Sequence, residues 1–154
     1  MSRFGLIADT HNYLSPAVLE HFVGVERILH AGDIGRPAII EELEQVAPVT
    51  AVLGNTDSDP GWRETEVVEV GRLRCLIRHI VDPDARTRDW LARLAKIRPS
   101  VVLFGHTHRP FCERRDRILF LNPGSASRPR GGSPASVAIL HVESGGPHVQ
   151  YVTL

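Results

Sequence analysis

The pattern that most limits the possible folds of this chain is a repeat of short apolar segments, each ending at a polar residue. Three segments have the composition and length of buried strands: residues 4–8, 27–31 and 49–53. Between them, residues 16–24 and the stretch opened by Pro37 place apolar residues at helical spacing. This strand–helix–strand–helix–strand order predicts parallel strands joined by right-handed crossovers.

Each predicted strand leads into a side chain that can bind metal. Asp9 and His11 follow the first strand, and Asp33 and Asn55, each after a glycine, follow the second and third. In open α/β sheets, ligands bind beyond the carboxyl ends of the strands, so we expect these side chains to share one rim. The Asp-x-His spacing is expected to place both side chains on one side of an extended segment, because strands have a period of two.

The pattern changes after Pro60. Residues 64–70 and 73–80 flank Gly71-Arg72, which predicts a β-hairpin, and residues 84–97 predict a helix with one apolar face. A buried strand at 100–104 is expected to end at Gly105-His106-Thr107-His108. The remaining predictions are short strands at 111–115, 118–121, 135–142 and 148–153, and a loop at 125–134.

Composition excludes several classes of protein. The 154 residues fit one domain, 1–154, and 42% apolar with 23% charged residues is typical of a globular chain. Eighteen basic residues balance 18 acidic ones, which disfavours a nucleic-acid binder because such proteins depend on a basic surface. No apolar stretch approaches the roughly 20 residues of a membrane helix, so we expect a cytoplasmic protein without membrane contact. Cys75 and Cys112 are expected to be free thiols.

Several histidines lie with carboxylates at the predicted strand ends, in the combination that binds metal ions. Five short elements carry them: Asp9-Thr10-His11, Gly32-Asp33, Gly54-Asn55-Thr56-Asp57, His79 and Gly105-His106-Thr107-His108. Mixed carboxylate, imidazole and amide ligands suit borderline divalent ions such as manganese, iron, cobalt, nickel and zinc. There are more ligands than one ion needs, and a bridging carboxylate would let them hold two ions about 3.5–4 Å apart.

These five elements, in this order over residues 9–108, resemble the pattern of the calcineurin-like metallophosphoesterases. The chain length is similar to that of their small bacterial and archaeal single-domain phosphodiesterases, and Asn122-Pro123-Gly124-Ser125 is similar to a segment that recurs there. The resemblance implies an α/β fold, a four-layer α/β/β/α sandwich of two mixed β-sheets flanked by helices.

Carried over position by position, the resemblance implies a centre of two divalent ions. Asp9, His11 and His108 would hold the first ion, Asn55, His79 and His106 the second, and Asp33 would bridge both. Asp57 keeps the family's acidic position, where it orients its neighbours, so the expected catalytic residues are Asp33, Asn55 and Asp57. Manganese is the favoured ion, with nickel, cobalt, iron and zinc as alternatives.

The implied reaction is hydrolysis of a small-molecule phosphodiester by a hydroxide that bridges the two ions. Such ions lower the pKa of bound water from 15.7 toward about 7 and attract an anionic phosphate. Arg36 and Arg109 lie beside ligand segments and are candidate substrate-binding residues, since a guanidinium can donate two hydrogen bonds to a phosphate. With 17 arginines in the chain, plain surface charge is the alternative.

Two positions depart from the family pattern. Thr56 stands where many members have a histidine tied to protonation of the leaving group, so no general acid is assigned. Ile80 follows His79 where the family usually has glycine, a departure that concerns the second ion. The histidines outside the pattern are interpreted as structural, with His30 a packed neighbour of the Asp33 segment: His21, His30, His141 and His148.

Two other functions stay open. A non-catalytic, protein-binding scaffold of the same fold, like a retromer subunit, has lost part of its metal site, whereas this chain keeps all seven ligand positions. A phosphomonoesterase would use the same ions on a more highly charged substrate. The apolar C-terminal strands also suggest association into a homo-oligomer.

Overall fold

The computed structural model describes residues 1–154 as two five-stranded sheets and three helices. The first sheet and its helices comprise β1 (Ser2–Ile7), α1 (Pro16–His21), β2 (Arg27–His30), α2 (Pro37–Glu44), β3 (Val49–Ala51), β9 (Ser136–Glu143) and β10 (Gly146–Thr153). The second comprises β4 (Thr65–Val70), β5 (Leu73–Arg78), α3 (Arg88–Ile97), β6 (Val101–Leu103), β7 (Pro110–Arg115) and β8 (Ile118–Pro123). None of the three helices is long and apolar enough to cross a membrane.

Both sheets are mixed, as expected. The first has the order β10-β9-β1-β2-β3, in which β1, β2 and β3 pair in parallel and β9 joins β1 antiparallel. The second has the order β4-β5-β6-β8-β7, with the predicted hairpin between β4 and β5. The parallel crossovers bring the carboxyl ends of β1, β2 and β3 to one edge, and those of β5 and β6 to the facing edge.

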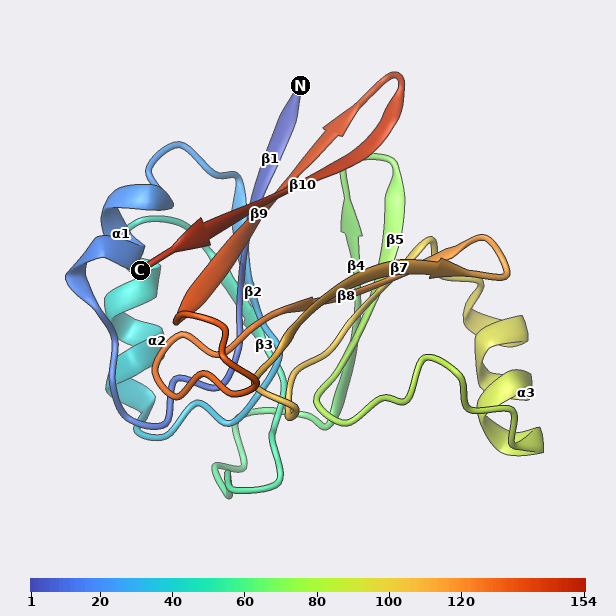
Figure 1. Ribbon diagram of the computed structural model, residues 1–154, viewed down its shortest axis with the longest axis horizontal. Helices are drawn as coiled ribbons and strands as arrows, with labels where there is room; N and C mark the ends of the chain where they lie inside the picture. The colour runs from blue at the N-terminus through green and yellow to red at the C-terminus, as the bar shows by residue number, and fades with distance from the viewer.

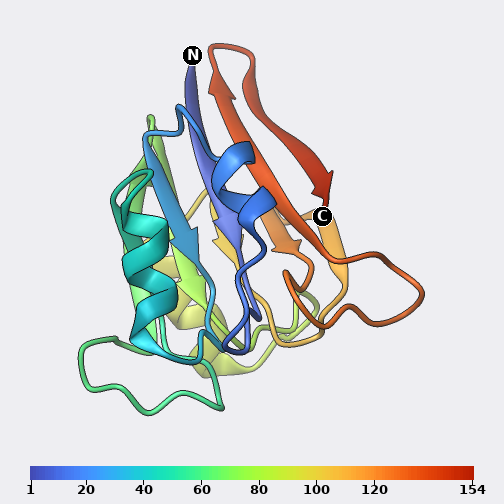
Figure 2. The ribbon, with the colours of Figure 1, turned by 90° about the vertical axis from the view of Figure 1, so that its left-hand side faces the viewer.

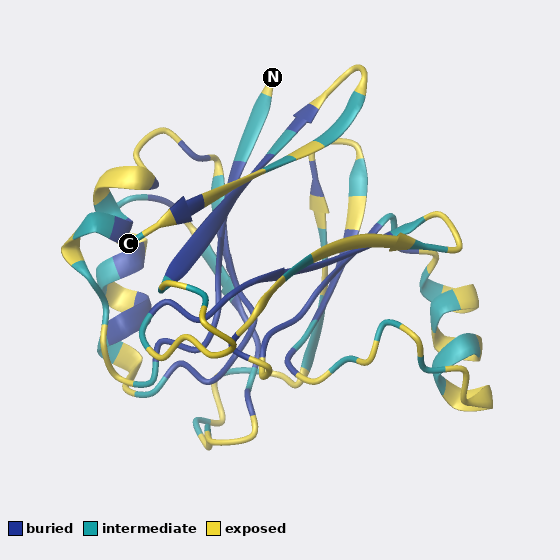
Figure 3. Cartoon of the chain, in the orientation of Figure 1, coloured by how far each residue is buried: buried dark blue, intermediate teal, exposed yellow.

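The two sheets pack face to face, with helices on the outer sides. Figure 1 shows α1 and α2 at one side of the molecule and α3 at the other, and Figure 2 shows α1 and α2 over the first sheet. Successive side chains of β1 point to opposite faces of the first sheet. Leu6 packs in the core between the two sheets, whereas Ile7 packs against α1 and α2. Figure 3 shows the buried residues concentrated in the strands. The four-layer α/β/β/α sandwich is therefore confirmed.

The helices are shorter than the apolar patterns predict. The expected helix over 84–97 begins only at Arg88, because the Thr87 side chain accepts a hydrogen bond from the Trp90 amide and the preceding residues form a turn. Likewise, α1 ends at His21 rather than near residue 24, where Gly24 has a φ of +85°.

Candidate metal centre

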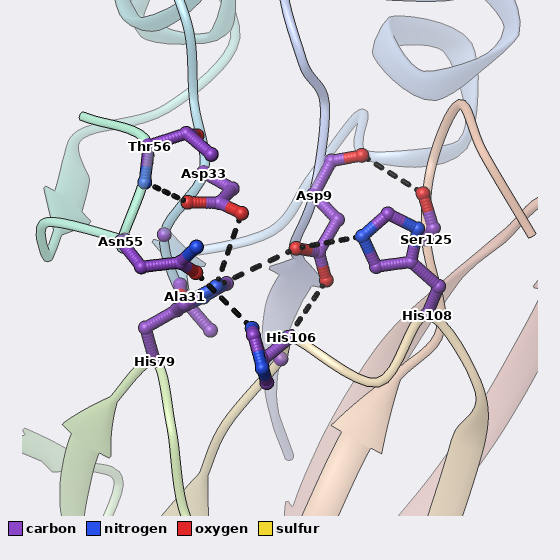
Figure 4. Close-up of polar contacts among 12 residues, drawn as sticks. Asp9, Ala31, Asp33, Asn55, Thr56, His79, His106, His108 and Ser125 are labelled. Carbon is purple, nitrogen blue, oxygen red and sulfur yellow. Dashed lines mark hydrogen bonds and ion pairs between the residues drawn. The ribbon is translucent and has the colours of Figure 1, made fainter.

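The strand ends of the two sheets bring the predicted ligands to one place. One group consists of Asp9, His11, Asp33 and His108, whose ligand atoms all lie within 4.8 Å of one another. The second group consists of Asp33, His79 and His106 and meets the same criterion. Figure 4 shows Asp33, Asn55 and His79 on one side of the centre and Asp9 and His108 on the other. Asp33 belongs to both groups, which is the arrangement that a bridging carboxylate requires.

The ligand segments are turns, and the expectation of an extended Asp-x-His segment is wrong. Five of the predicted ligands have left-handed backbone angles: Asp9 (φ +53°), His11 (+44°), Asp33 (+54°), His106 (+72°) and His108 (+59°). Each such residue costs about 1–2 kcal/mol relative to a right-handed conformation. The backbone reverses direction immediately after each strand, so turn geometry rather than strand periodicity makes these side chains converge. Strain concentrated in this way is typical of functional sites.

Two glycines make room for this convergence. A Cβ on Gly54 would overlap the carboxylate and the backbone nitrogen of Asp33. A Cβ on Gly105 would lie 2.9 Å from Oδ2 of Asp9 and 3.0 Å from Cβ of Ala8. The glycines before Asn55 and His106 are therefore required by the close approach of the Asp33 and Asp9 segments.

Hydrogen bonds on the outer ring nitrogens orient two of the imidazoles. Nδ1 of His79 donates to the Ala31 carbonyl oxygen at 2.8 Å, and Nδ1 of His108 donates to the Arg128 carbonyl oxygen at 2.6 Å. Because a neutral imidazole has one N–H, each ring then keeps its Nε2 lone pair for the centre. A backbone acceptor on the second ring nitrogen is the usual arrangement for metal-binding histidines.

The inward-facing atoms have the spacing of ligands around an ion. Nε2 of His11 lies 3.2 Å from Nε2 of His108, Nε2 of His79 lies 3.2 Å from Oδ2 of Asp33, and Nε2 of His108 lies 3.4 Å from Oδ1 of Asp9. Ligand atoms about 2.1 Å from a metal are about 3.0–3.4 Å apart in octahedral or tetrahedral geometry. The separations therefore match those of atoms that share a cation.

Two buried atoms of the centre have no hydrogen-bond partner. They are Oδ1 of Asp9 and Nε2 of His79, and both face the point where the imidazoles converge. A buried polar atom without a partner costs about 1–3 kcal/mol, and such atoms are rare in native proteins. A bound cation removes this cost, so the residues present fit a metal ion.

Asn55 and His106 complete the set at the solvent-exposed side of the centre. Nδ1 of His106 lies 3.1 Å from Oδ1 of Asn55, and the backbone amide of His106 donates to Oδ2 of Asp9 at 3.0 Å. The predicted ligand Asn55 therefore contacts His106, a member of the second group. All seven predicted ligands thus lie in one cluster.

Asp57 binds backbone amides beside the cluster. Its carboxylate accepts hydrogen bonds from the amides of Ile34 (3.1 Å), Gly35 (3.1 Å) and Gly54 (2.9 Å). The carboxylate therefore ties the turn after β2 to the turn after β3, which carry Asp33 and Asn55. This geometry matches the orienting role expected of Asp57.

Burial and neighbouring charges raise the pKa values of some groups in the centre and lower those of others. Burial raises the pKa of Asp9 to about 7, whereas the neighbouring His79 imidazole and the hydrogen bond from the Thr56 amide overcome burial and hold the pKa of Asp33 below its usual range. The carboxylates raise the pKa of His79 against the effect of burial. Burial lowers the pKa values of His11 and His108, so both rings are neutral near pH 7 and able to bind metal.

His30 is a buried support of the centre, as the sequence suggested. Its Nδ1 accepts the Gly32 amide at 3.1 Å, so Nε2 carries the proton and donates to Oγ1 of Thr10 at 3.0 Å. Thr10 in turn donates to the Ile34 carbonyl oxygen at 2.7 Å. Burial lowers the pKa of His30 to about 3. The neutral ring thereby links the segments that carry Asp9 and Asp33.

The structure also reveals positioning residues that sequence reasoning missed. Ser125 and Ser127 both donate to the Asp9 carbonyl oxygen, at 2.9 and 3.0 Å, and Asn122 donates to the Gly105 carbonyl oxygen at 3.1 Å. These residues follow or end β8, which runs to Pro123 rather than stopping at residue 121 as expected. The only signal in the sequence was the similarity of Asn122-Pro123-Gly124-Ser125 to a family segment, which did not indicate its contacts.

The two arginines expected to bind substrate have different surroundings. Arg36 precedes α2 and is exposed; its guanidinium makes no hydrogen bond or ion pair. Arg109 lines a hollow beside His106, and its Nε would be 2.9 Å from a Cβ on Gly131. Among the departures from the family pattern, the Thr56 amide donates to Oδ1 of Asp33 at 3.0 Å, and Ile80 is exposed. The bulk of Ile80 therefore does not displace His79, which remains in the cluster.

Comparison with known proteins identifies the family. The model of the calcineurin-like phosphoesterase superfamily domain matches residues 2–145. A probable metallophosphoesterase of Methanothermobacter thermautotrophicus is 37% identical over 147 residues, covering 90% of this chain and 85% of the relative. The structure of the Escherichia coli phosphoesterase YfcE, also described as a phosphodiesterase, has a TM-score of 0.69 at 30% identity, covering 90% of this chain and 88% of YfcE.

A second solved structure has the same fold. Wild-type Vps29 of Entamoeba histolytica, in complex with zinc, has a TM-score of 0.76 at 22% identity and covers 97% of this chain and 98% of its own. At this identity the likeness shows the fold alone. The family model and the Methanothermobacter relative match this chain in sequence, and YfcE matches it in both sequence and structure, so the chain belongs to the calcineurin-like phosphoesterase superfamily.

Proposed function

We propose that this chain is a metal-dependent phosphodiesterase that hydrolyses small-molecule phosphodiesters at a centre of two divalent transition-metal ions. The observation that carries the proposal is the pair of partnerless buried atoms, Oδ1 of Asp9 and Nε2 of His79, which lie 3.7 Å apart beside the shared Asp33. Among relatives, the names phosphodiesterase and probable metallophosphoesterase support this class of reaction. Manganese is the favoured ion, because mixed oxygen and nitrogen ligands suit it, and nickel, cobalt, iron and zinc are alternatives.

Each ligand has a defined part in holding the ions. Asp9, His11 and His108 would hold one ion, Asn55, His79 and His106 the other, and Asp33 both. Ions bound there supply Lewis-acid charge for the phosphate and acidify a water molecule near neutral pH. The chain's own contribution is orientation: the carbonyl oxygens of Ala31 and Arg128 fix the rings of His79 and His108 before substrate arrives.

Asp57 and the arginines act around this centre. The Asp57 carboxylate fixes the relative position of the turns that carry Asp33 and Asn55 by accepting three backbone amides. Arg109, in the hollow beside His106, is placed to donate to a phosphate oxygen, whereas the Arg36 guanidinium has no partner in the site. Thr56 cannot act as a general acid in place of the histidine that many family members have there. The proposal therefore predicts faster turnover of esters with good leaving groups.

The proposal is tested by metal analysis and turnover on one preparation. Purified protein is stripped with chelator, reloaded with manganese, nickel or cobalt, and assayed on bis(4-nitrophenyl) phosphate and on 4-nitrophenyl phosphate. We expect about two ions per chain, turnover that disappears with chelator and returns with metal, and a higher kcat/KM on the diester. Absence of metal-dependent turnover with all three ions would contradict the proposal.

The same experiment decides between the alternatives. A higher kcat/KM on the monoester would make the protein a phosphomonoesterase with the same centre. Fewer than one tightly bound ion per chain, together with no turnover, would favour a protein-binding scaffold. The complete ligand cluster argues against the scaffold, and the likeness to Vps29 adds no functional argument at 22% identity.

A further inference from the structure

Two hollows lie beside the metal centre. The first has a volume of about 310 Å³ and adjoins Asn55 and His79. The second has a volume of about 640 Å³ and adjoins His106. Both fall in the range of about 300–1,000 Å³ that is usual for small-molecule sites. Either could receive the organic part of a phosphate ester, so their linings decide between them.

Charge favours the second hollow. The first is lined by two carboxylates, Asp57 and Glu64, against one guanidinium, Arg78. The second is lined by two guanidinium groups, Arg109 and Arg130, against one carboxylate, Asp82. A phosphodiester is an anion, and its approach is favoured along the wall with excess positive charge.

The second hollow also has aromatic residues in its wall, which the first lacks. Phe104 and Phe111 line it, with ring centroids 5.9 Å apart at an interplanar angle of 59°. Pro83 and Pro110 are further apolar residues of its wall. Aromatic side chains arranged in this way bind planar rings through edge-to-face and offset contacts.

Backbone contacts hold the arginines at the boundary between the hollow and the centre. The Arg130 amide donates to the His108 carbonyl oxygen at 3.1 Å, which ties the loop at 125–134 to a metal-ligand segment. The Arg109 side chain passes over Gly131, where φ is +69° and a Cβ would crowd its Nε. The loop therefore approaches Arg109 closely and places both cations beside His106.

We propose that this second hollow, the aromatic-arm pocket, receives a planar aromatic arm of the phosphodiester substrate. Its defining residues are Phe104, His106, Arg109, Phe111 and Arg130. Phe111 contacts the ring, and Arg109 and Arg130 donate to the non-bridging phosphate oxygens. This inference rests on the proposed function and narrows its substrate class to aryl or heteroaryl phosphodiesters.

Binding, rather than turnover alone, tests the pocket. Titration calorimetry on manganese-loaded protein compares phenyl phosphate with methyl phosphate, two ligands that differ only in the organic arm. We expect phenyl phosphate to bind about tenfold more tightly, because its ring removes more apolar area from water. Phe111→Leu keeps the apolar packing but removes the flat ring, and should reduce the ratio to about threefold or less.

The arginine variants separate charge from ring contact. Arg109→Ala or Arg130→Ala should weaken both ligands by about tenfold and leave their ratio unchanged, since each removes a charge-assisted hydrogen bond to phosphate. Arg78→Ala, which removes a guanidinium from the first hollow, is the matched control and should leave both affinities unchanged. Equal affinities in the wild type, an unchanged ratio in Phe111→Leu, or an Arg78→Ala effect as large as that of Arg109→Ala would overturn the inference.

Turnover of bis(4-nitrophenyl) phosphate by the same preparations distinguishes the two proposals. Metal-dependent turnover without any preference for phenyl phosphate refutes the pocket and leaves the phosphodiesterase intact. A preserved preference for phenyl phosphate without turnover on any ester refutes the phosphodiesterase and leaves the pocket intact.

Discussion

The two ligand groups of the metal centre differ in how firmly the fold holds them. In the first group, Asp9 and His108 are buried, and the Asp9 backbone is tied down by Ser125 and Ser127. In the second group, apart from the shared Asp33, only His79 is buried and anchored, whereas His106 is exposed and contacts the exposed Asn55. The first group is therefore more firmly preorganised, and the second depends on exposed side chains that the fold holds by fewer contacts.

This difference predicts the order in which the two groups bind metal ions. A preorganised site loses less conformational entropy when an ion binds, so the first group should fill at lower metal concentration than the second. Asp33 joins the groups, which means that an ion in the first also positions one ligand of the second. The substitutions below test this order, from the largest expected effect to the smallest.

Removing the carboxylate that the two groups share should impair metal binding in both. Asp33→Asn keeps the shape of the side chain and an acceptor for the Thr56 amide, but removes the carboxylate common to both groups. We expect kcat/KM on bis(4-nitrophenyl) phosphate to fall by at least about 100-fold, with loss of metal measured by mass spectrometry. An unchanged circular dichroism spectrum is the control for folding, and near-normal turnover would show that Asp33 does not bridge.

Substitutions in the two groups should have different effects on metal content. His79→Ala should remove the second ion and leave the first, with a fall in turnover of about 10- to 100-fold, while His11→Ala should weaken the first. Metal content per chain, measured after dialysis at a series of manganese concentrations, separates the two cases. Loss of both ions in His79→Ala would mean that the groups do not bind independently.

Asp57→Ala tests whether the two turns need their common clamp. Three backbone amides lose an acceptor, at Ile34, Gly35 and Gly54, so we expect a loss of about 1–3 kcal/mol in unfolding free energy and weaker binding at both groups. Urea unfolding of the metal-free protein gives the first quantity. Asp59→Ala is the matched control, since that carboxylate accepts only the Gly61 amide in the same loop. Equal losses in the two variants would contradict the role given to Asp57.

The smallest effect concerns His30 and the pH dependence of stability. Its pKa is about 3 in the folded state against 6.5 ordinarily, so between these values the unfolded state binds one more proton. Stability from this group is complete above pH 6.5 and falls as the pH falls, by about 2 kcal/mol between pH 6.5 and 5.

The comparison with His30→Gln isolates this contribution. Glutamine can donate to Thr10 without titrating, so the variant should lack this part of the decline. Urea unfolding of metal-free protein at both pH values measures the difference, and His21→Gln, at an exposed position, serves as the control. Identical pH dependence in wild type and His30→Gln would show that the ring is not held neutral.

Local sequence patterns were sufficient to predict the strands and the residue types of the centre. The apolar segments before Asp9, Asp33 and Asn55 correspond to β1, β2 and β3, and the hairpin around Gly71 corresponds to β4 and β5. These patterns are local, because burial of one face imposes a period that neighbouring residues must share. The start of α3 was placed too early, at residue 84, because the apolar face does not mark where a helix begins, whereas the Thr87 cap does.

The hydrogen bonds that position the ligands of the centre could not be predicted from local sequence patterns. The His106 amide binds the carboxylate of Asp9 and Ser125 binds the Asp9 carbonyl oxygen, although 97 and 116 residues separate the partners. The strand period even suggested the wrong geometry for Asp9 and His11, which converge through left-handed turns. Such turns are stabilised by tertiary contacts that offset their local cost.

By itself, the sequence determined the fold class, the order of the ligand segments and the chemistry of the ligands, since these follow from local periodicity and residue type. The tertiary structure alone decided that the ligand segments are left-handed turns, that carbonyl oxygens orient His79 and His108, and that Arg109 lines a hollow with Arg130 whereas Arg36 does not. The physical reason is that these features depend on where two facing sheets bring distant turns together, and no short-range pattern encodes that distance.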